Sequence, residues 1–158
     1  MYFWKVNALA EDFRNDKVTQ KEQLKYFLLY SLLISFVIDV PALGDSSWNS
    51  PIFEWVELGV NLIITFWGII WCFRANQQGD DKDFLARTLC LGLPIAVRLL
   101  LWCIILLIIE IILFKGGQSI WRDIFRLAET ALFMILYYAL TRKYILYIAI
   151  NENKNLHE

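Results

Sequence analysis

The chain has few of the residue types that catalytic and metal centres need. Its one histidine is His157, near the end of the sequence, so neither a bis-histidine haem site nor a zinc-hydrolase motif can form. Its three cysteines, Cys72, Cys90 and Cys103, contain no C-x-x-C pair, which argues against a disulfide oxidoreductase. A G-x-S-x-G motif and a glycine-rich phosphate-binding loop are also absent. The sequence therefore predicts no catalytic residue, no metal site and no cofactor.

The sequence also lacks an excess of either charge. Fifteen Lys and Arg against 16 Asp and Glu leave a net charge of −1, and the basic residues occur in short groups. This pattern predicts no nucleic-acid partner. Apolar side chains, by contrast, are abundant: 58% of the residues are hydrophobic, whereas soluble domains contain about 45–50%. A soluble fold of 158 residues could not cover that much apolar surface, so a lipid bilayer is the expected surrounding.

Four stretches of the sequence are long and apolar enough to cross a hydrocarbon core of about 30 Å. They lie at about 24–43, 53–73, 88–114 and 120–141. None alternates apolar and polar residues, and lipid tolerates no unpaired backbone groups, so these stretches are predicted to be helices. The predicted fold class is all-α: an integral membrane protein whose residues 24–150 form an antiparallel four-helix transmembrane bundle.

The two ends of the chain are predicted to lie outside this bundle. Residues 1–23 form a cytoplasmic amphipathic arm and residues 151–158 a cytoplasmic polar tail. In the arm, apolar residues recur at helical spacing, at Phe3, Val6, Leu9, Ala10 and Phe13. This spacing predicts an interfacial helix on the inner leaflet. Thr19 followed by Glu22 predicts a capping box at the start of the first membrane helix.

Basic residues flank the predicted spans unequally. Eleven fall on one side of the membrane: Lys5, Arg14, Lys17, Lys21, Lys25, Arg74, Lys82, Arg87, Arg142, Lys143 and Lys154. At most three, Lys115, Arg122 and Arg126, fall on the other side. Because cytoplasmic loops carry the excess of Lys and Arg, both termini are predicted to be cytoplasmic. The expected location is the cell membrane, as a multi-pass protein of an inner membrane.

Some charged residues are separated from the cytoplasmic end of their span by less than the thickness of the hydrocarbon core, so they are expected to lie inside it. A helix rises about 1.5 Å per residue, so Glu129 lies only about 20 Å from Arg142. That distance is shorter than the core, and Arg142 can extend its side chain to the headgroups. Glu129 and Arg126 are therefore predicted to lie inside the membrane.

The same measurement predicts a polar layer with one residue from each helix. Its members lie about 16–21 Å from the cytoplasmic boundary and are Asp39, Asn61, Arg98 and Glu129. Glu57 and Arg126 lie just beyond this layer, on the same helix faces as Asn61 and Glu129. Glu110 is about 120° around its helix from Arg98, so it is expected at the outer interface instead.

Two interpretations of the polar layer remain open. Ionisable groups inside a membrane point at neighbouring helices or at water. In the first interpretation the residues pair and hold the helices in register, Arg98 with Asp39 or Glu129. Arg126 would pair with Glu57 in the same way. In the second interpretation they line a polar cavity that binds a cation, a proton or a small polar ligand, so all six residues are candidate ligand- or ion-binding residues.

The predicted function is that of a small non-enzymatic membrane protein, working as a homo-oligomer or as part of a membrane complex. A cytoplasmic protein partner is expected to bind the N-terminal arm and the 74–87 loop. The alternative is a small ion- or proton-coupled transporter or channel that uses the carboxylates within the membrane. A membrane enzyme acting on lipid comes third, because the sequence offers no recognisable nucleophile.

Overall fold

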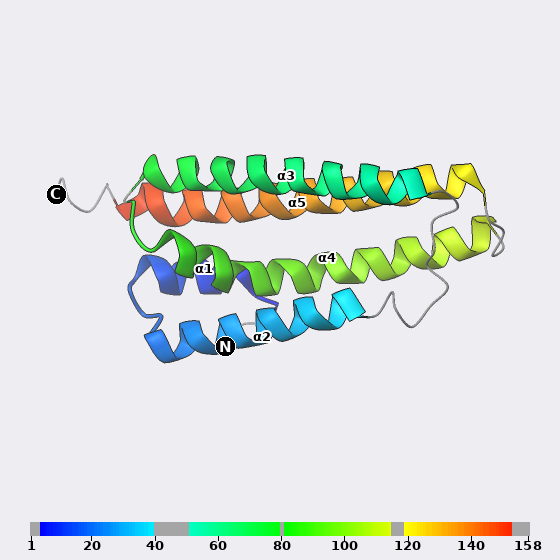
Figure 1. Ribbon diagram of the computed structural model, residues 1–158. Helices are drawn as coiled ribbons and strands as arrows, with labels where there is room; N and C mark the ends of the chain where they lie inside the picture. Colours follow the sequence, from blue (N-terminus) through cyan, green and yellow to red (C-terminus); the bar gives the residue numbers. More distant parts are fainter. Residues whose placement is uncertain (1–3, 40–50, 80, 115–118, 153–158) are drawn as a thin grey trace.

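The computed structural model of the 158-residue chain is all-helical wherever it describes the backbone, as the fold-class prediction states (Figure 1). It describes the backbone of residues 4–39, 51–79, 81–114 and 119–152, and the side chains of residues 4–34, 52–79, 81–114 and 119–149. Its five helices are α1 (Val6–Arg14), α2 (Gln20–Asp39), α3 (Pro51–Gln77), α4 (Phe84–Phe114) and α5 (Ile120–Glu152).

Within the described chain, three helices are long and apolar enough to cross a membrane. These segments are Ile52–Gln77, Phe84–Phe114 and Ile120–Ala149, and no more than 11% of the best apolar window in each is buried by the protein itself. They contain the second, third and fourth predicted spans. The first predicted span begins within α2, which carries charged residues near both ends, and its residues 40–43 lie outside the described chain.

α5 is longer than the span predicted at its position. It continues past residue 141 to Glu152 because the extra turns place Ile145, Ile148 and Ala149 in the protein core. The predicted polar tail therefore begins as helix, and its residues 153–158 lie outside the described chain.

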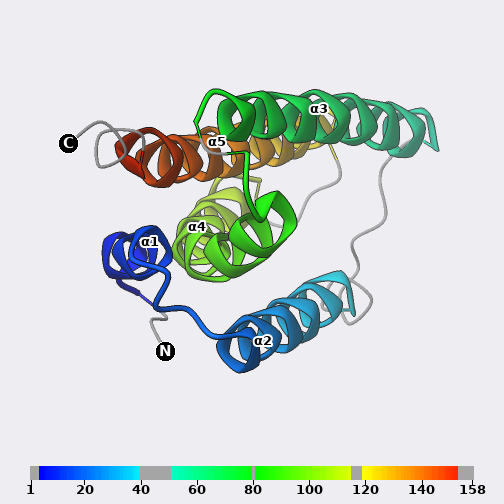
Figure 2. The same ribbon diagram turned by 90° about the vertical axis from the view of Figure 1, so that its left-hand side faces the viewer.

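The long helices pack as an open row. α3 packs against α5, α5 against α4, and α4 against α2, whereas α2 and α3 share no substantial contact within the described chain. Figure 2 shows α4 in the middle of the assembly, with α3 and α5 on one side and α2 on the other. The end of α3, the start of α4 and the end of α5 lie together with α1 at one end of the molecule (Figure 1). We call the other end, where α4 ends and α5 begins, the distal end.

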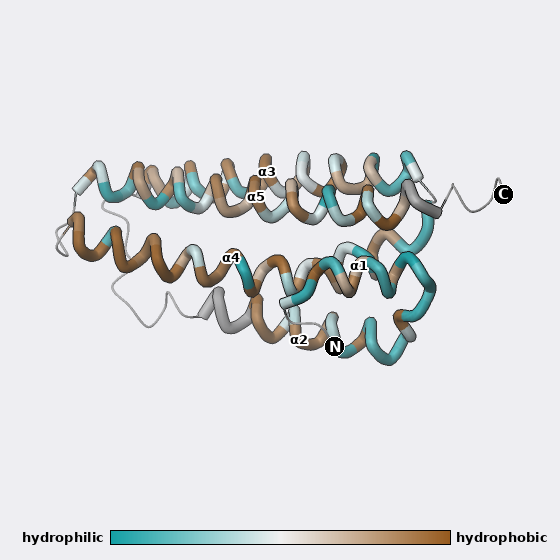
Figure 3. The backbone as a smooth tube through the Cα atoms, turned by 180° about the vertical axis from the view of Figure 1, so that it is seen from behind, coloured by the Kyte–Doolittle hydropathy of each residue, from teal (hydrophilic) through white to brown (hydrophobic). Residues whose placement is uncertain are grey.

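The N-terminal helix α1 packs lengthwise against α4 and α5. Its apolar face, formed by Val6, Leu9, Ala10 and Phe13, is at most 6% exposed. An interfacial helix would lie across the ends of the spans and leave this face to lipid. In this protein α4 and α5 cover that face instead. Figure 3 shows that the most apolar part of α4 lies beyond α1, toward the distal end.

The predicted capping box at the start of α2 is confirmed. The backbone N–H of Thr19 donates to Glu22 Oε2 at 3.1 Å, and the backbone N–H of Glu22 lies 3.4 Å from Thr19 Oγ1. Two backbone donors of the first turn therefore have partners, which fixes the point at which α2 begins.

Candidate functional site

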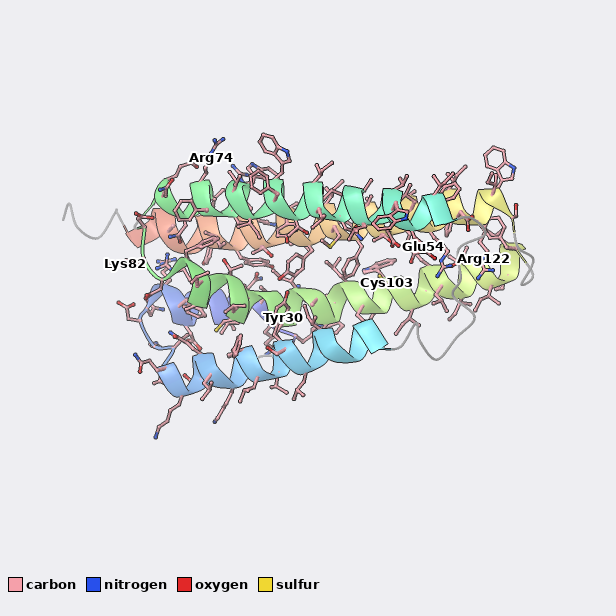
Figure 4. All side chains as sticks on the ribbon, in the orientation of Figure 1. Tyr30, Glu54, Arg74, Lys82, Cys103 and Arg122 are labelled. Atoms are coloured by element: carbon pink, nitrogen blue, oxygen red, sulfur yellow. The ribbon has the colours of Figure 1, made fainter. Side chains whose placement is uncertain are left out.

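The distal end contains an ion-pair cluster that joins α4 to α5. Arg122 Nε donates to Glu110 Oε1 at 2.8 Å, and Arg126 Nε lies 3.8 Å from the same oxygen. Figure 4 shows Arg122 between the two helices at this end. Glu110 is only 8% exposed, because α5 covers it with Arg122 and Arg126; its depth at the outer interface stays a prediction. We refer to Glu110, Arg122 and Arg126 as the distal ion-pair cluster.

Glu110 is a functional candidate that the depth measurement along single helices missed. The short connection between α4 and α5 could have indicated its partners. α4 ends at Phe114 and α5 begins at Ile120, so residues that are equally far from the connection lie opposite each other on the two helices. Counting outward from that connection places Glu110 opposite the helical turn that contains Arg122 and Arg126. A comparison of neighbouring helices, rather than of each helix with the membrane boundary, would have found the cluster.

A second polar contact of the predicted layer joins α3 to α5. Thr130 Oγ1 lies 3.3 Å from Glu57 Oε1 and can donate a hydrogen bond to it. Asn61, on the same face of α3, has a buried Oδ1 without a hydrogen-bond partner in the described chain. Glu57 contacts Thr130 and Arg126 lies beside Glu110, while the pairing of Glu57 with Arg126 stays a prediction.

Arg98 binds the N-terminal segment. Its Nη2 donates to the backbone carbonyl of Trp4, and its guanidinium carbon lies 5.8 Å from the centre of the Trp4 indole. The arm therefore reaches to the middle of α4 alongside the other helices. The side chain of Asp39, the other predicted partner of Arg98, lies outside the described side chains.

Glu129 lies in a different setting from the other charges. It lines a cavity of about 200 Å³ between α4 and α5. The other lining residues are apolar or weakly polar: Leu99, Trp102, Cys103, Leu106, Leu132, Phe133, Leu136 and Leu140. Among the described residues, none forms a hydrogen bond or ion pair with the Glu129 carboxyl group. Of the described residues of the predicted layer, Arg98 is thus bound to the arm, Asn61 has an Oδ1 without a hydrogen-bond partner in the described chain, and Glu129 faces a cavity.

The opposite end of the molecule carries polar contacts that the sequence did not predict. Arg87 Nη1 donates to Asn76 Oδ1 at 3.2 Å, and Asn76 Nδ2 donates to the Lys82 carbonyl at 3.2 Å. Asn76 and Arg87 are both buried, so these bonds fix the turn between α3 and α4. Farther along, the hydroxyls of Tyr30 and Tyr137 lie 2.9 Å apart and link α2 to α5.

Within the described ranges, no three His, Cys, Asp or Glu side chains gather closely enough to hold a metal ion. The three cysteines are free thiols. No family model, curated protein or solved structure matches the chain. Polar contacts that the structure describes join one helix to another, and one carboxyl group, that of Glu129, lines a cavity.

Proposed function

We propose that the chain is a multi-pass protein of the cell membrane with both termini in the cytoplasm. We further propose that it acts as a non-enzymatic part of a homo-oligomer or of a complex with a partner protein. On this proposal α2 is a fourth membrane helix, and the long helices form an antiparallel four-helix bundle. The α1 segment, the start of α2, the α3–α4 turn with its flanking residues and the end of α5 gather at one end. This supports the orientation, because most of the basic residues lie in those segments.

The observation that carries the non-enzymatic proposal is the distal ion-pair cluster. Glu110, Arg122 and Arg126 pair across α4 and α5, which is what charges inside a membrane do when they stabilise packing. The open row of helices supports the oligomer or complex. α2 and α3 share no substantial contact in the described chain, so a neighbouring protein could complete the bundle there.

A cytoplasmic partner would meet polar surfaces. The apolar face of α1 is already covered, so the arm can offer the exposed side chains of its other face, such as Lys5, Asn7 and Glu11. The turn between α3 and α4 adds Lys82 and Asp83, which are also exposed.

Glu129 favours a second candidate function, a small ion- or proton-coupled transporter or channel. Its carboxyl group faces a cavity of about 200 Å³ and has no hydrogen-bond or ion-pair partner among the described residues. An ionisable group without a permanent partner inside a membrane is suited to binding a proton or a cation. On this candidate, Glu129 carries the ion and the paired residues hold the helices around it.

The mass of the purified particle in lipid nanodiscs, combined with ion flux into liposomes, separates the two candidates. A defined oligomer or a co-purified partner without flux supports the complex. Flux that is lost in a folded Glu129→Gln variant supports the transporter, with Glu54→Gln as the control because Glu54 is exposed. A monomer without a partner and without flux would contradict both.

A further inference from the structure

A groove lined by residues of α3 and α5 combines an apolar wall with a positive end. It has a volume of about 410 Å³. We call it the α3–α5 groove, and it is lined by Ile63, Ile64, Trp67, Gly68, Ile70, Trp71, Arg74, Ile135 and Tyr138. Eight of these nine residues carry no charge, and the exception, Arg74, lies close to the end of α3.

The length of the groove matches one leaflet of a bilayer. From Ile63 to Arg74, α3 rises about 16 Å. Half of a hydrocarbon core of about 30 Å is nearly the same length. With Arg74 at the headgroup level, the groove therefore extends to about the middle of the membrane.

Two arginines mark the headgroup end of the groove. Arg74 is exposed, and Figure 4 shows its side chain extending away from α3. The guanidinium of Arg142, from α5, lies 4.5 Å from the centre of the Trp71 ring, which forms part of the groove wall. No described acidic side chain forms an ion pair with either arginine, and the buried Nε of Arg142 has no hydrogen-bond partner in the described chain. These two positive charges thus lack a counter-charge from the described part of the protein.

We propose that the α3–α5 groove binds an anionic phospholipid. One acyl chain lies along the apolar wall, and the phosphate is held by Arg74 and Arg142. Charge complementarity selects this occupant, because two unpaired guanidinium groups at the end of an apolar groove match a phosphate attached to hydrocarbon. The proposal rests on the membrane location and is independent of whether the protein forms a complex or transports an ion.

Native mass spectrometry of the full chain in detergent tests the proposal. Phosphatidylglycerol and phosphatidylcholine with identical acyl chains are added separately, and the bound lipid is counted. We expect phosphatidylglycerol to bind more tightly. Arg74→Gln and Arg142→Gln should each weaken its binding roughly fivefold, the effect of one basic residue near a lipid headgroup. Lys143→Gln is the matched control, because Lys143 is an exposed neighbour of Arg142 outside the groove lining, and it should bind as the parent does.

A fourth variant tests the acyl-chain part of the site without removing charge. Ile135→Trp places a larger side chain in the groove and should lower phosphatidylglycerol binding while both arginines remain. Glycerol 3-phosphate, which has the phosphate but no acyl chain, should not compete. Thermal unfolding of each variant shows whether it is folded. Equal binding of the two lipids, or undiminished phosphatidylglycerol binding by a folded Arg74→Gln/Arg142→Gln protein, would overturn the proposal.

Discussion

Gly68 of α3 lies directly against the ring of Tyr138 of α5. A Cβ atom at residue 68 would lie 2.3 Å from Cγ of the tyrosine ring, closer than two carbon atoms can approach. The absence of a side chain at this position therefore lets α3 and α5 approach each other, and they form one of the principal helix contacts of the molecule.

Gly68→Ala should push α3 and α5 apart. Overpacking of this kind costs about 1–3 kcal/mol, so we expect a lower free energy of unfolding, measured by thermal or denaturant unfolding in detergent. Gly59→Ala on the same helix is the control. Nothing lies within 4 Å of a Cβ built at Gly59, so its stability should stay the same or rise by up to about 1 kcal/mol. Equal effects of the two substitutions would show that the contact with Tyr138 does not determine the helix spacing.

The distal ion-pair cluster should stabilise the protein through coupling between its members. Glu110→Gln and Arg122→Gln should each lower the free energy of unfolding by about 1.5–3 kcal/mol, because each leaves a buried or mostly buried charged partner without its hydrogen bond. The double substitution should cost less than the sum of the two single ones, as expected for residues in contact. Additive losses in this double-mutant cycle would contradict a direct pair. Glu54→Gln, at an exposed carboxylate, should have little effect.

Arg98 should control how firmly the N-terminal arm is docked. Arg98→Gln removes the guanidinium that contacts both the carbonyl and the ring of Trp4. Amide hydrogen exchange should then become faster in α1 while α3 keeps its protection. In a double substitution with Glu129→Gln, the effects on stability should add, since Arg98 contacts Trp4 and Glu129 faces the cavity. A coupling of more than about 0.5 kcal/mol would instead support a direct pair between these two residues.

The capping box should stabilise the start of α2 locally. Thr19→Ala removes the side-chain acceptor for the Glu22 N–H and should cost about 1 kcal/mol. Hydrogen exchange in the first turn of α2 should increase, while the turn between α3 and α4 should not change. An unchanged exchange rate at residues 20–24 would show that this cap contributes little in the folded protein.

The sequence was sufficient to predict the features that depend on the residues of one helix alone. The helical class and the last three long apolar helices followed from length and composition, and the start of α2 followed from Thr19 and Glu22. The spacing of apolar residues also identified the four residues of α1 that are buried, Val6, Leu9, Ala10 and Phe13. These features depend on residues close together in the chain, so local patterns predict them.

The partners of the charged residues could not be predicted from depth alone. Two residues at one depth can pair only if their helices are neighbours and their faces meet, and the order in which the helices pack cannot be predicted from the pattern of any one helix. Arg98 faces the arm because α1 packs between α4 and α5, a contact between segments far apart in the chain. The partners of Glu110 were missed because its angle was measured only from Arg98 on the same helix, whereas its partners lie on α5.

The docking of α1 has a consequence for the order in which the protein is built. The arm is the first described helix to leave the ribosome, yet the helices that cover its apolar face are α4 and α5. About 100 residues separate the end of α1 from the start of α5, and at about 5–20 residues per second their synthesis takes roughly 5–20 s. During that interval the apolar side of α1 has no place to dock and must be kept from aggregation by lipid or by a chaperone. Although α1 is made before α4 and α5, it can reach its final position only after both of them have been made.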